Sequence, residues 1–141
     1  MKPNAPARTP GRGRWTMDDG LKVGGELTVE RRPWGYFETL AKGEGWLFKR
    51  LVVQPRKRLS LQYHIHRAEH WVVVRGAGSV QIGQRREAVQ PGSTVTIAVK
   101  ELHRIENTDA TKPLEFLEIQ VGAVLSETDI VRVEDDYGRI S

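Results

Sequence analysis

The stretch LSLQYHIHRAEHWVVVRGA, residues 59–77, carries the pattern from which the rest of this chain can be interpreted. It holds three of the chain's 4 histidines, at positions 64, 66 and 70. If a strand covers residues 59–66, the two-residue side-chain period places Gln62, His64 and His66 on one face. Polar groups at alternate positions, opposite an aromatic and aliphatic face, indicate a binding site rather than core.

A second predicted strand, over residues 69–74, turns Glu69 to one face and His70 to the other, where His70 packs or supports the site. The fourth histidine, His103, ends a later apolar run. A lone strand histidine more often packs or faces solvent, so the interpretation depends on the clustering. Imidazole nitrogens with carboxylate and amide oxygens suit a divalent transition metal, and Zn, Fe, Mn, Ni and Co all fit. We therefore predict a metal site with the ligands Gln62, His64, Glu69 and His103.

These residues also resemble a known family. The pattern Q-x-H-x4-E-x6-G at residues 62–76, followed by H-x3-N at 103–107, resembles the two cupin motifs, with Gln where many cupins have the first His. Residues 59–71 more closely resemble the signature of type II mannose-6-phosphate isomerase cupins, found alone and as the C-terminal domain of bifunctional enzymes that also carry GDP-mannose pyrophosphorylase. The segments RPWG, KR and DIVRVEDDYGR also match, at residues 32–35, 49–50 and 129–139. The resemblance thus covers about residues 30–140.

Two departures from the family pattern affect the site. Family members usually have another His at the position of Ile65, which faces away from the predicted metal. The loop before the last ligand usually reads P-x-G-x-x-H, whereas residues 98–103 read AVKELH. Loss of both Pro and Gly is expected to re-aim His103 or to reshape the cavity mouth.

The resemblance implies reversible interconversion of mannose 6-phosphate and fructose 6-phosphate through an enediol. The metal, Zn in the first place with Mn, Fe, Co or Ni as alternatives, would hold the oxygen on which charge develops. A side chain in the same cavity must move the proton. Charged residues that interrupt aliphatic strand faces are candidates, because lone buried charges are costly. The predicted catalytic residues are Lys49, His66 and Glu118, with solvent exposure as the alternative for Lys49 and Glu118.

The substrate phosphate requires cations, and Arg pairs well with phosphate oxygens. The candidates are Arg50, Arg67, Arg104 and Arg132, with Arg104 favoured because it adjoins His103. Arg32 with Trp34, and Asp135 with Arg139, are expected instead to tie the two chain ends onto the barrel.

Two other functions fit the same residues. One is a non-catalytic sugar- or metal-binding cupin, which the altered loop at residues 98–102 favours. The other is a different metal-cupin enzyme, such as an iron oxygenase with two His and one carboxylate, for which Gln62 is an unusual ligand. Oxygen uptake with Fe(II) would identify the oxygenase. A homodimer paired through strand edges is expected from the resemblance alone.

Composition narrows the class of protein further. The 141 residues suffice for one domain, and the absence of cysteine excludes disulfides and thiolate metal sites. No apolar stretch approaches the ~20 residues that span a bilayer, so a cytoplasmic protein is expected. The chain has 22 basic and 18 acidic residues, and the whole excess of positive charge lies in residues 1–15. No aromatic-basic platform for nucleic acid follows this segment. We predict a disordered basic tail over residues 1–25 and a cupin domain over 26–141.

Short segments rich in β-branched and aromatic residues recur from residue 26 onward, separated by Gly, Pro, Asn and Asp. Ten strands are predicted, over residues 26–30, 35–40, 46–53, 59–66, 70–75, 79–82, 86–89, 94–98, 103–107 and 114–121. They favour an all-β fold, a single cupin jelly-roll barrel. The glycines of residues 76–78 predict a tight hairpin. A short capped helical turn is predicted over residues 126–131.

Overall fold

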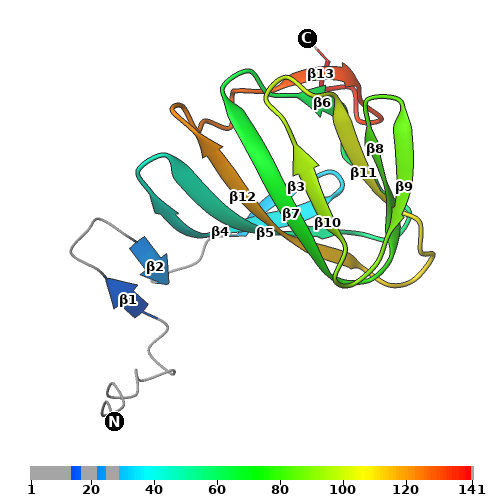
Figure 1. The fold of residues 1–141 in the computed structure, drawn as a ribbon. Helices are drawn as coiled ribbons and strands as arrows, with labels where there is room; N and C mark the ends of the chain where they lie inside the picture. Colours follow the sequence, from blue (N-terminus) through cyan, green and yellow to red (C-terminus); the bar gives the residue numbers. More distant parts are fainter. Residues whose placement is uncertain (1–13, 17–21, 25–28, 141) are drawn as a thin grey trace.

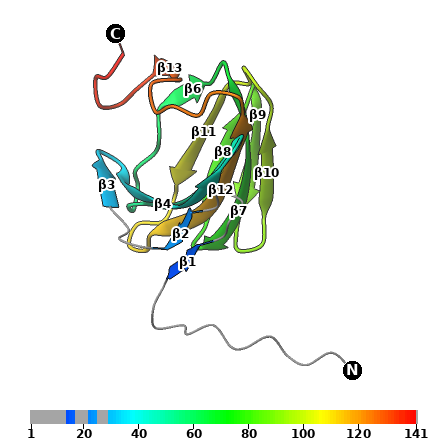
Figure 2. The same ribbon diagram turned by 90° about the vertical axis from the view of Figure 1, so that its left-hand side faces the viewer.

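The computed structural model describes residues 14–16, 22–24 and 29–140. In these ranges the chain forms two antiparallel β-sheets that lie face to face (Figure 1, Figure 2). The predicted all-β, two-sheet fold is therefore confirmed. The described ranges contain no helix, and accordingly none that is long and apolar enough to cross a membrane.

The larger sheet has the strand order β1-β2-β4-β5-β12-β7-β10, with β3 paired to β4. Its strands are β1 (Arg14–Thr16), β2 (Lys22–Gly24), β3 (Val29–Arg32), β4 (Gly35–Gly43), β5 (Trp46–Val53), β7 (Arg67–Arg75), β10 (Thr94–Ile97) and β12 (Leu114–Gly122). The smaller sheet has the order β13-β6-β11-β8-β9. Its strands are β6 (Leu61–Tyr63), β8 (Gly78–Ile82), β9 (Arg85–Val89), β11 (His103–Asn107) and β13 (Val131–Glu134). Strands β6 and β13 lie side by side near the C-terminus (Figure 1).

The side chains between the sheets change character along each central strand. On β12 the inward residues are first Leu114 and Phe116 and then Glu118 and Gln120, each at most 4% exposed. Strands β5 and β7 run antiparallel to β12 on either side, and their inward residues change from polar to apolar. The polar ends of the three strands therefore meet at one level and the apolar ends at another.

We call these two levels the polar half and the apolar half of the barrel interior. The apolar half contains Leu51, Val53, Trp71, Val73, Val80, Ile105, Leu114 and Phe116. The polar half contains Lys49, Gln62, His64, Arg67, Glu69, His103, Glu118 and Gln120, all of them buried. Burial of apolar side chains stabilises the fold, whereas buried charges lower stability unless they are paired.

The prediction of a hairpin at residues 76–78 is wrong. Strand β7 belongs to the larger sheet and β8 to the smaller one, so this segment is a corner between sheets. Glycine is needed there because Gly76 has a φ of +86° and a Cβ on Gly78 would lie 2.3 Å from the carbonyl oxygen of Glu106. A hairpin and a corner have the same glycine requirement, which explains the error.

Two further elements differ from the prediction. Strand β6 ends at Tyr63, not at residue 66, because the carboxylate of Asp129 accepts hydrogen bonds from the amides of Ile65 and His66, both at 2.9 Å. Residues 126–131 form no helix. They contain a single turn, closed by the amide of Asp129 and the carbonyl of residue 126 at 3.0 Å, and lead into the unpredicted strand β13.

Part of the segment predicted as a disordered tail is strand. Strand β1 pairs with β2, and β2 pairs with β4 through Val23 and Ala41. The remainder of residues 1–25 lies outside the described ranges, and the domain boundary at residue 26 stays a prediction.

Candidate metal centre

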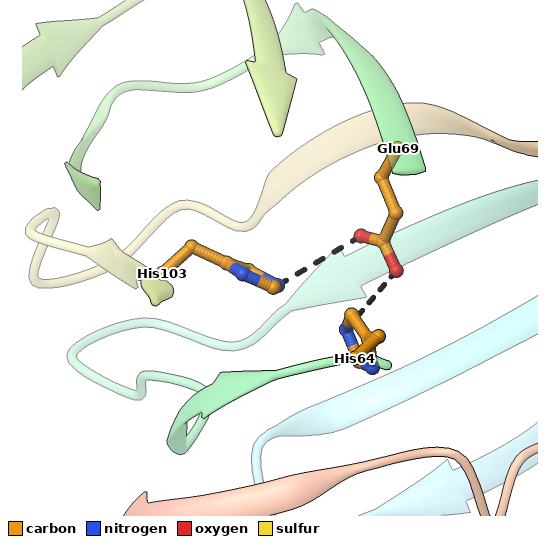
Figure 3. A group of neighbouring side chains, drawn as sticks. All are labelled: His64, Glu69 and His103. Carbon is orange, nitrogen blue, oxygen red and sulfur yellow. Dashed lines mark ion pairs between the residues drawn. The ribbon is translucent and has the colours of Figure 1, made fainter. Parts of the chain in front are cut away.

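Three buried side chains of the polar half converge on one point (Figure 3). Glu69 comes from β7, His103 from β11 and His64 from the turn that follows β6. The Nε2 atom of His64 lies 3.1 Å from Glu69 Oε2, and the Nε2 atom of His103 lies 3.9 Å from Glu69 Oε1. One potential ligand atom of each residue lies within 4.8 Å of the others. The structure thus brings together three of the four predicted ligands as a compact group.

Both imidazoles are oriented through their other nitrogen. The Nδ1 atom of His64 lies 2.7 Å from the carbonyl oxygen of Asp129, and Nδ1 of His103 lies 2.8 Å from that of Glu101. A carbonyl only accepts hydrogen bonds, so each Nδ1 carries the proton and each Nε2 has its lone pair directed at Glu69. Burial, with Arg67 and His103 nearby, lowers the pKa of His64 to about 4, and burial also lowers the pKa of His103. Both rings are therefore neutral at pH 7, which is the form that binds metal.

The donor set fits a divalent cation. Among the described residues, Nε2 of His103 is buried and has no hydrogen-bond partner. Two hydrogen bonds fix the orientation of the Glu69 carboxylate. Its Oε2 accepts a hydrogen bond from Nε of Arg67 at 2.8 Å, and its Oε1 accepts one from Nε1 of Trp71 at 3.0 Å. Two neutral imidazole nitrogens and one oriented carboxylate form a set common to Zn and Fe(II) sites. A bound cation would also satisfy the orphaned nitrogen of His103.

Gln62, the fourth predicted ligand, lies at the edge of this group. It is cross-strand neighbour to His103, and its Nε2 lies 3.4 Å from Nε2 of His64. Its Oε1 accepts a hydrogen bond from the hydroxyl of Ser60 at 2.7 Å. The two ends of an amide are exchangeable by rotation, and a serine hydroxyl can donate or accept. Rotation of the amide would present the oxygen of Gln62 to a cation while Ser60 kept a hydrogen bond.

The loop at residues 98–102 keeps His103 aimed at Glu69 despite its altered sequence. Lys100 stands where the family usually has Gly, and it adopts the left-handed conformation with a φ of +68°. Its amide donates to the carbonyl of His64 at 2.8 Å, and the carboxylate of Glu101 accepts from the amide of Ala98 at 2.9 Å. The expected re-aiming of His103 therefore does not occur.

Lys49 and Glu118 lie inside the barrel, as the strand pattern predicts. They are cross-strand neighbours on β5 and β12, 3% and 4% exposed, and both line a cavity of about 90 Å³ beside Glu69. Lys49 forms an ion pair with Glu127. Glu118 accepts a hydrogen bond from Gln120 at 2.7 Å. Burial raises the pKa of Glu118 to about 7, with the Glu69 carboxylate adding to the rise and Lys49 opposing it.

Two predicted neighbours of the cluster point away from it. His66 is exposed because the chain leaves the strand at Tyr63, so it does not continue the row of His64. His70 is exposed on the outer side of β7, not packed or supporting the site.

The predicted phosphate-binding arginines occupy three different environments. Arg67 and Arg132 line the cavity, and Arg67 pairs with Glu69. Arg50 lies on the outer face of the larger sheet, with side-chain hydrogen bonds to Glu38 and Glu115, both at 2.5 Å. Arg104 is buried outside the cavity wall, where its Nε donates to the carbonyl of residue 59 at 2.9 Å. Side chains alternate along β11, so the adjacency of Arg104 to His103 turns it away from the site.

Sequence reasoning missed several residues of the site. Asp129 supplies the carbonyl that orients His64 and the carboxylate that shapes the turn after β6. The sequence signal that could have identified Asp129 is its position at the start of the family-like segment DIVRVEDDYGR. Glu127, from the predicted helical turn, also lines the cavity, as do Arg32 and Arg139, which were predicted only as ties of the chain ends. Arg132, a predicted phosphate-binding candidate, lines it as well.

A family model described as "Mannose-6-phosphate isomerase C-terminal" matches residues 25–135 of this chain. The chain belongs to this family. The resemblance seen in the sequence is thereby confirmed, and the cluster of His64, Glu69 and His103 lies where the two cupin motifs of the family come together.

The chain is similar to part of several longer proteins. The xanthan biosynthesis protein XanB of Xanthomonas campestris pv. campestris is 43% identical over 108 residues, which cover 77% of this chain and 23% of XanB. The alginate biosynthesis protein AlgA of Pseudomonas aeruginosa is 41% identical over 108 residues, and the mannose-1-phosphate guanylyltransferase ManC of Salmonella typhimurium is 40% identical over 109. The chain spans less than a quarter of the length of these relatives.

Solved structures identify the same fold. Oxalate decarboxylase from Bacillus subtilis superposes with a TM-score of 0.72 at 16% identity, over 88% of this chain and 34% of the other. The capsular polysaccharide assembling protein CapF from Staphylococcus aureus gives a TM-score of 0.67 at 19% identity, over 78% of this chain and 35% of the other. The predicted cupin fold is thus confirmed.

Proposed function

We propose that this chain is a metal-dependent isomerase that interconverts mannose 6-phosphate and fructose 6-phosphate. The observation that carries the proposal is the convergence of two neutral imidazole nitrogens and Glu69 on one point, beside a cavity wall that holds Lys49 and Glu118. Membership of the mannose-6-phosphate isomerase C-terminal family supports the choice of substrate.

His64, Glu69 and His103, with Gln62 after rotation of its amide, would hold the metal. A bound divalent cation supplies a Lewis acid that stabilises negative charge on a sugar oxygen. Zn is our first choice, and Mn, Fe, Co and Ni also suit these ligands.

Glu118 is the proposed proton carrier. Its carboxylate would take the proton from C2 of the aldose, which leaves an enediolate with its negative charge on O1. It would then return the proton to C1 while the proton of the C2 hydroxyl passes to O1, so that C2 becomes the ketone. A pKa of about 7 suits a group that must both accept and donate a proton near neutral pH. The buried ammonium of Lys49, directly across from Glu118, would donate a hydrogen bond to the oxygen that becomes negative. The exposed position of His66 argues against a role in this transfer.

Proton exchange with solvent tests this function. Metal-stripped protein is reloaded with Zn, Mn, Co or Fe(II), and deuterium entry at C1 and C2 of both sugar phosphates is followed by NMR in D2O. We expect metal-dependent exchange that is lost in His64→Ala and retained in Arg85→Gln, whose side chain is exposed and does not line the cavity. Tight metal binding without label in either sugar would reject the isomerase.

One observation favours a second candidate, a metal-free sugar-phosphate-binding domain. The guanidinium of Arg67 already supplies Glu69 with a cation at 2.8 Å and lies 3.4 Å from Nε2 of His64. In that case the sugar phosphate binds equally well with and without metal, and no deuterium exchange occurs. The iron oxygenase would instead consume oxygen when loaded with Fe(II).

A further inference from the structure

Three arginines stand together on the wall of the cavity, and only Arg132 among them was a predicted phosphate ligand. Arg32 comes from the end of β3 in the larger sheet, Arg132 from β13 in the smaller sheet, and Arg139 from the segment after β13. All three are partly exposed, unlike the buried groups deeper in the polar half. Arg132 and Arg139 also line a second, adjoining hollow with Ile130 and Val131.

The ionic pairing of the cavity wall leaves one of these arginines without a counter-charge. Lys49 pairs with Glu127, and Arg67 pairs with Glu69. Arg139 pairs with Asp135, with Nη2 and Oδ1 2.8 Å apart. Among the described residues, no ion pair involves Arg132, and its Nε is buried without a hydrogen-bond partner.

Arg32 is only weakly neutralised. Its Nη2 lies 3.7 Å from the carboxylate of Glu30, and both side chains are exposed enough for solvent to screen the pair. Burial lowers the pKa of Arg132, and Arg139 and Arg32 lower it further against the opposing effect of Asp135. An uncompensated group of guanidinium ions is the usual protein partner of a phosphate, because the planar fork donates to two oxygens at once.

The strand register sets the backbone spacing between Arg132 and His103, one residue of the candidate metal centre. In the smaller sheet Arg132 is paired with Gln62, and Gln62 is paired with His103. Two interstrand spacings amount to about 9–10 Å, which is comparable to the length of an extended hexose 6-phosphate. Glu69 and all three arginines line the same cavity, so one sugar phosphate can place its reacting end at the metal centre and its phosphate at the arginines.

We propose that Arg32, Arg132 and Arg139 form the subsite that binds the 6-phosphate of the substrate, with C1 and C2 directed at His64, Glu69 and His103. This assignment rests on the proposed isomerase function and replaces Arg50 and Arg104 as phosphate ligands. Arg132 is the principal contact, since its Nε lacks another acceptor. Arg139 is held in place by Asp135, and Arg32 reaches across from the opposite sheet.

Steady-state kinetics of Arg132→Gln, Arg132→Lys and Arg32→Gln test the subsite, with Arg85→Gln as the matched control on the exposed surface. Loss of charge-assisted hydrogen bonds to phosphate is expected to raise the KM for mannose 6-phosphate about tenfold to a hundredfold. The kcat should change much less, because the reacting atoms lie elsewhere. Arg132→Lys should recover part of the affinity, and Arg32→Gln serves as the test if Arg132→Gln does not fold.

Failure of the subsite and failure of the isomerase are separable. If the wild-type protein isomerises mannose 6-phosphate and both Gln variants keep its KM, the subsite is refuted and the isomerase stands. If the wild-type protein shows no isomerisation, calorimetric titration with inorganic phosphate decides the subsite alone. Binding that Arg132→Gln abolishes and Arg85→Gln retains would support it, and equal or absent binding in all three proteins would overturn it.

Discussion

The two halves of the barrel interior are built by the same strands with opposite chemistry. On β12, Leu114 and Phe116 are fully buried among apolar side chains, and Glu118 and Gln120 follow at the same inward positions. The apolar half stabilises the fold through burial. The polar half places buried charges where they can act on a ligand and must neutralise them through pairs such as Arg67 and Glu69. The comparison predicts that mutations in one half change stability and mutations in the other change activity.

The largest effect is expected from Glu118→Gln. Removal of the proton carrier should lower kcat by about 10²–10⁴-fold, whereas stability should be unchanged or higher because an ionisable group is no longer buried. Measurement of kcat and of urea denaturation on the same preparations checks both. Glu115→Gln, on the outer face of the same strand, is the matched control. A wild-type kcat in Glu118→Gln would contradict the assignment of activity to the polar half and of stability to the apolar half.

Phe116→Ala should show the opposite pattern. Phe116 is fully buried and packs against Trp71 with ring centroids 4.7 Å apart. Its truncation should lower the free energy of unfolding by about 3–5 kcal/mol, with kcat per folded molecule nearly unchanged. Urea denaturation gives the free energy of unfolding. The rate at low temperature, divided by the concentration of active sites from a titration, gives kcat per folded molecule. A large fall in kcat without loss of stability would contradict the assignment of Phe116 to the apolar half.

The pH dependence of stability sharpens the comparison. In metal-stripped protein, the pKa of Glu118 is raised from 4.5 to about 7, so the folded state holds its proton more tightly than the unfolded state. This stabilisation is fully present below pH 4.5 and is lost as the pH rises through about 7. The wild-type free energy of unfolding should therefore fall relative to that of Glu118→Gln across this range. Parallel stability–pH curves for the two proteins would show that Glu118 is not the group responsible.

Lys100→Gly should have the smallest effect. The backbone of Lys100 adopts a left-handed conformation with a φ of +68°, which is unfavourable for a residue with a Cβ. Glycine relieves that strain but gains entropy in the unfolded chain, so the net stabilisation should be about 0.5 kcal/mol. Metal affinity should not change, since the loop already aims His103. A loss of stability or metal affinity on substitution would mean that the Lys100 side chain supports the loop.

Strand periodicity predicted the parts of the site that depend only on side-chain alternation. It placed Lys49 and Glu118 inside the barrel and turned His70 away from Glu69. The same rule argues against Arg104 as a site residue, because neighbours on a strand face opposite sides, and it outweighs the adjacency of Arg104 to His103 in the sequence. Such local patterns can be predicted from sequence because the direction of the side chains along a strand repeats every two residues.

Contacts between distant segments could not be predicted in the same way. The exposure of His66 results from the turn that Asp129 organises from more than sixty residues away. The corner at residues 76–78 has the glycines of a hairpin, and only the partners of β7 and β8 distinguish the two. Arg132 reaches the cavity wall through the pairing of β13 with β6, and β13 was not predicted as a strand.

The most direct test of the central claim is a metal titration of the stripped protein, followed by calorimetry with Zn and compared between wild type, His103→Ala and His70→Ala. The account predicts one metal ion per chain in the wild type and in His70→Ala, whose side chain is exposed on the outer side of β7, and loss of that binding in His103→Ala. Metal that binds equally to all three proteins, or to none, would contradict the assignment of the polar half as a metal centre.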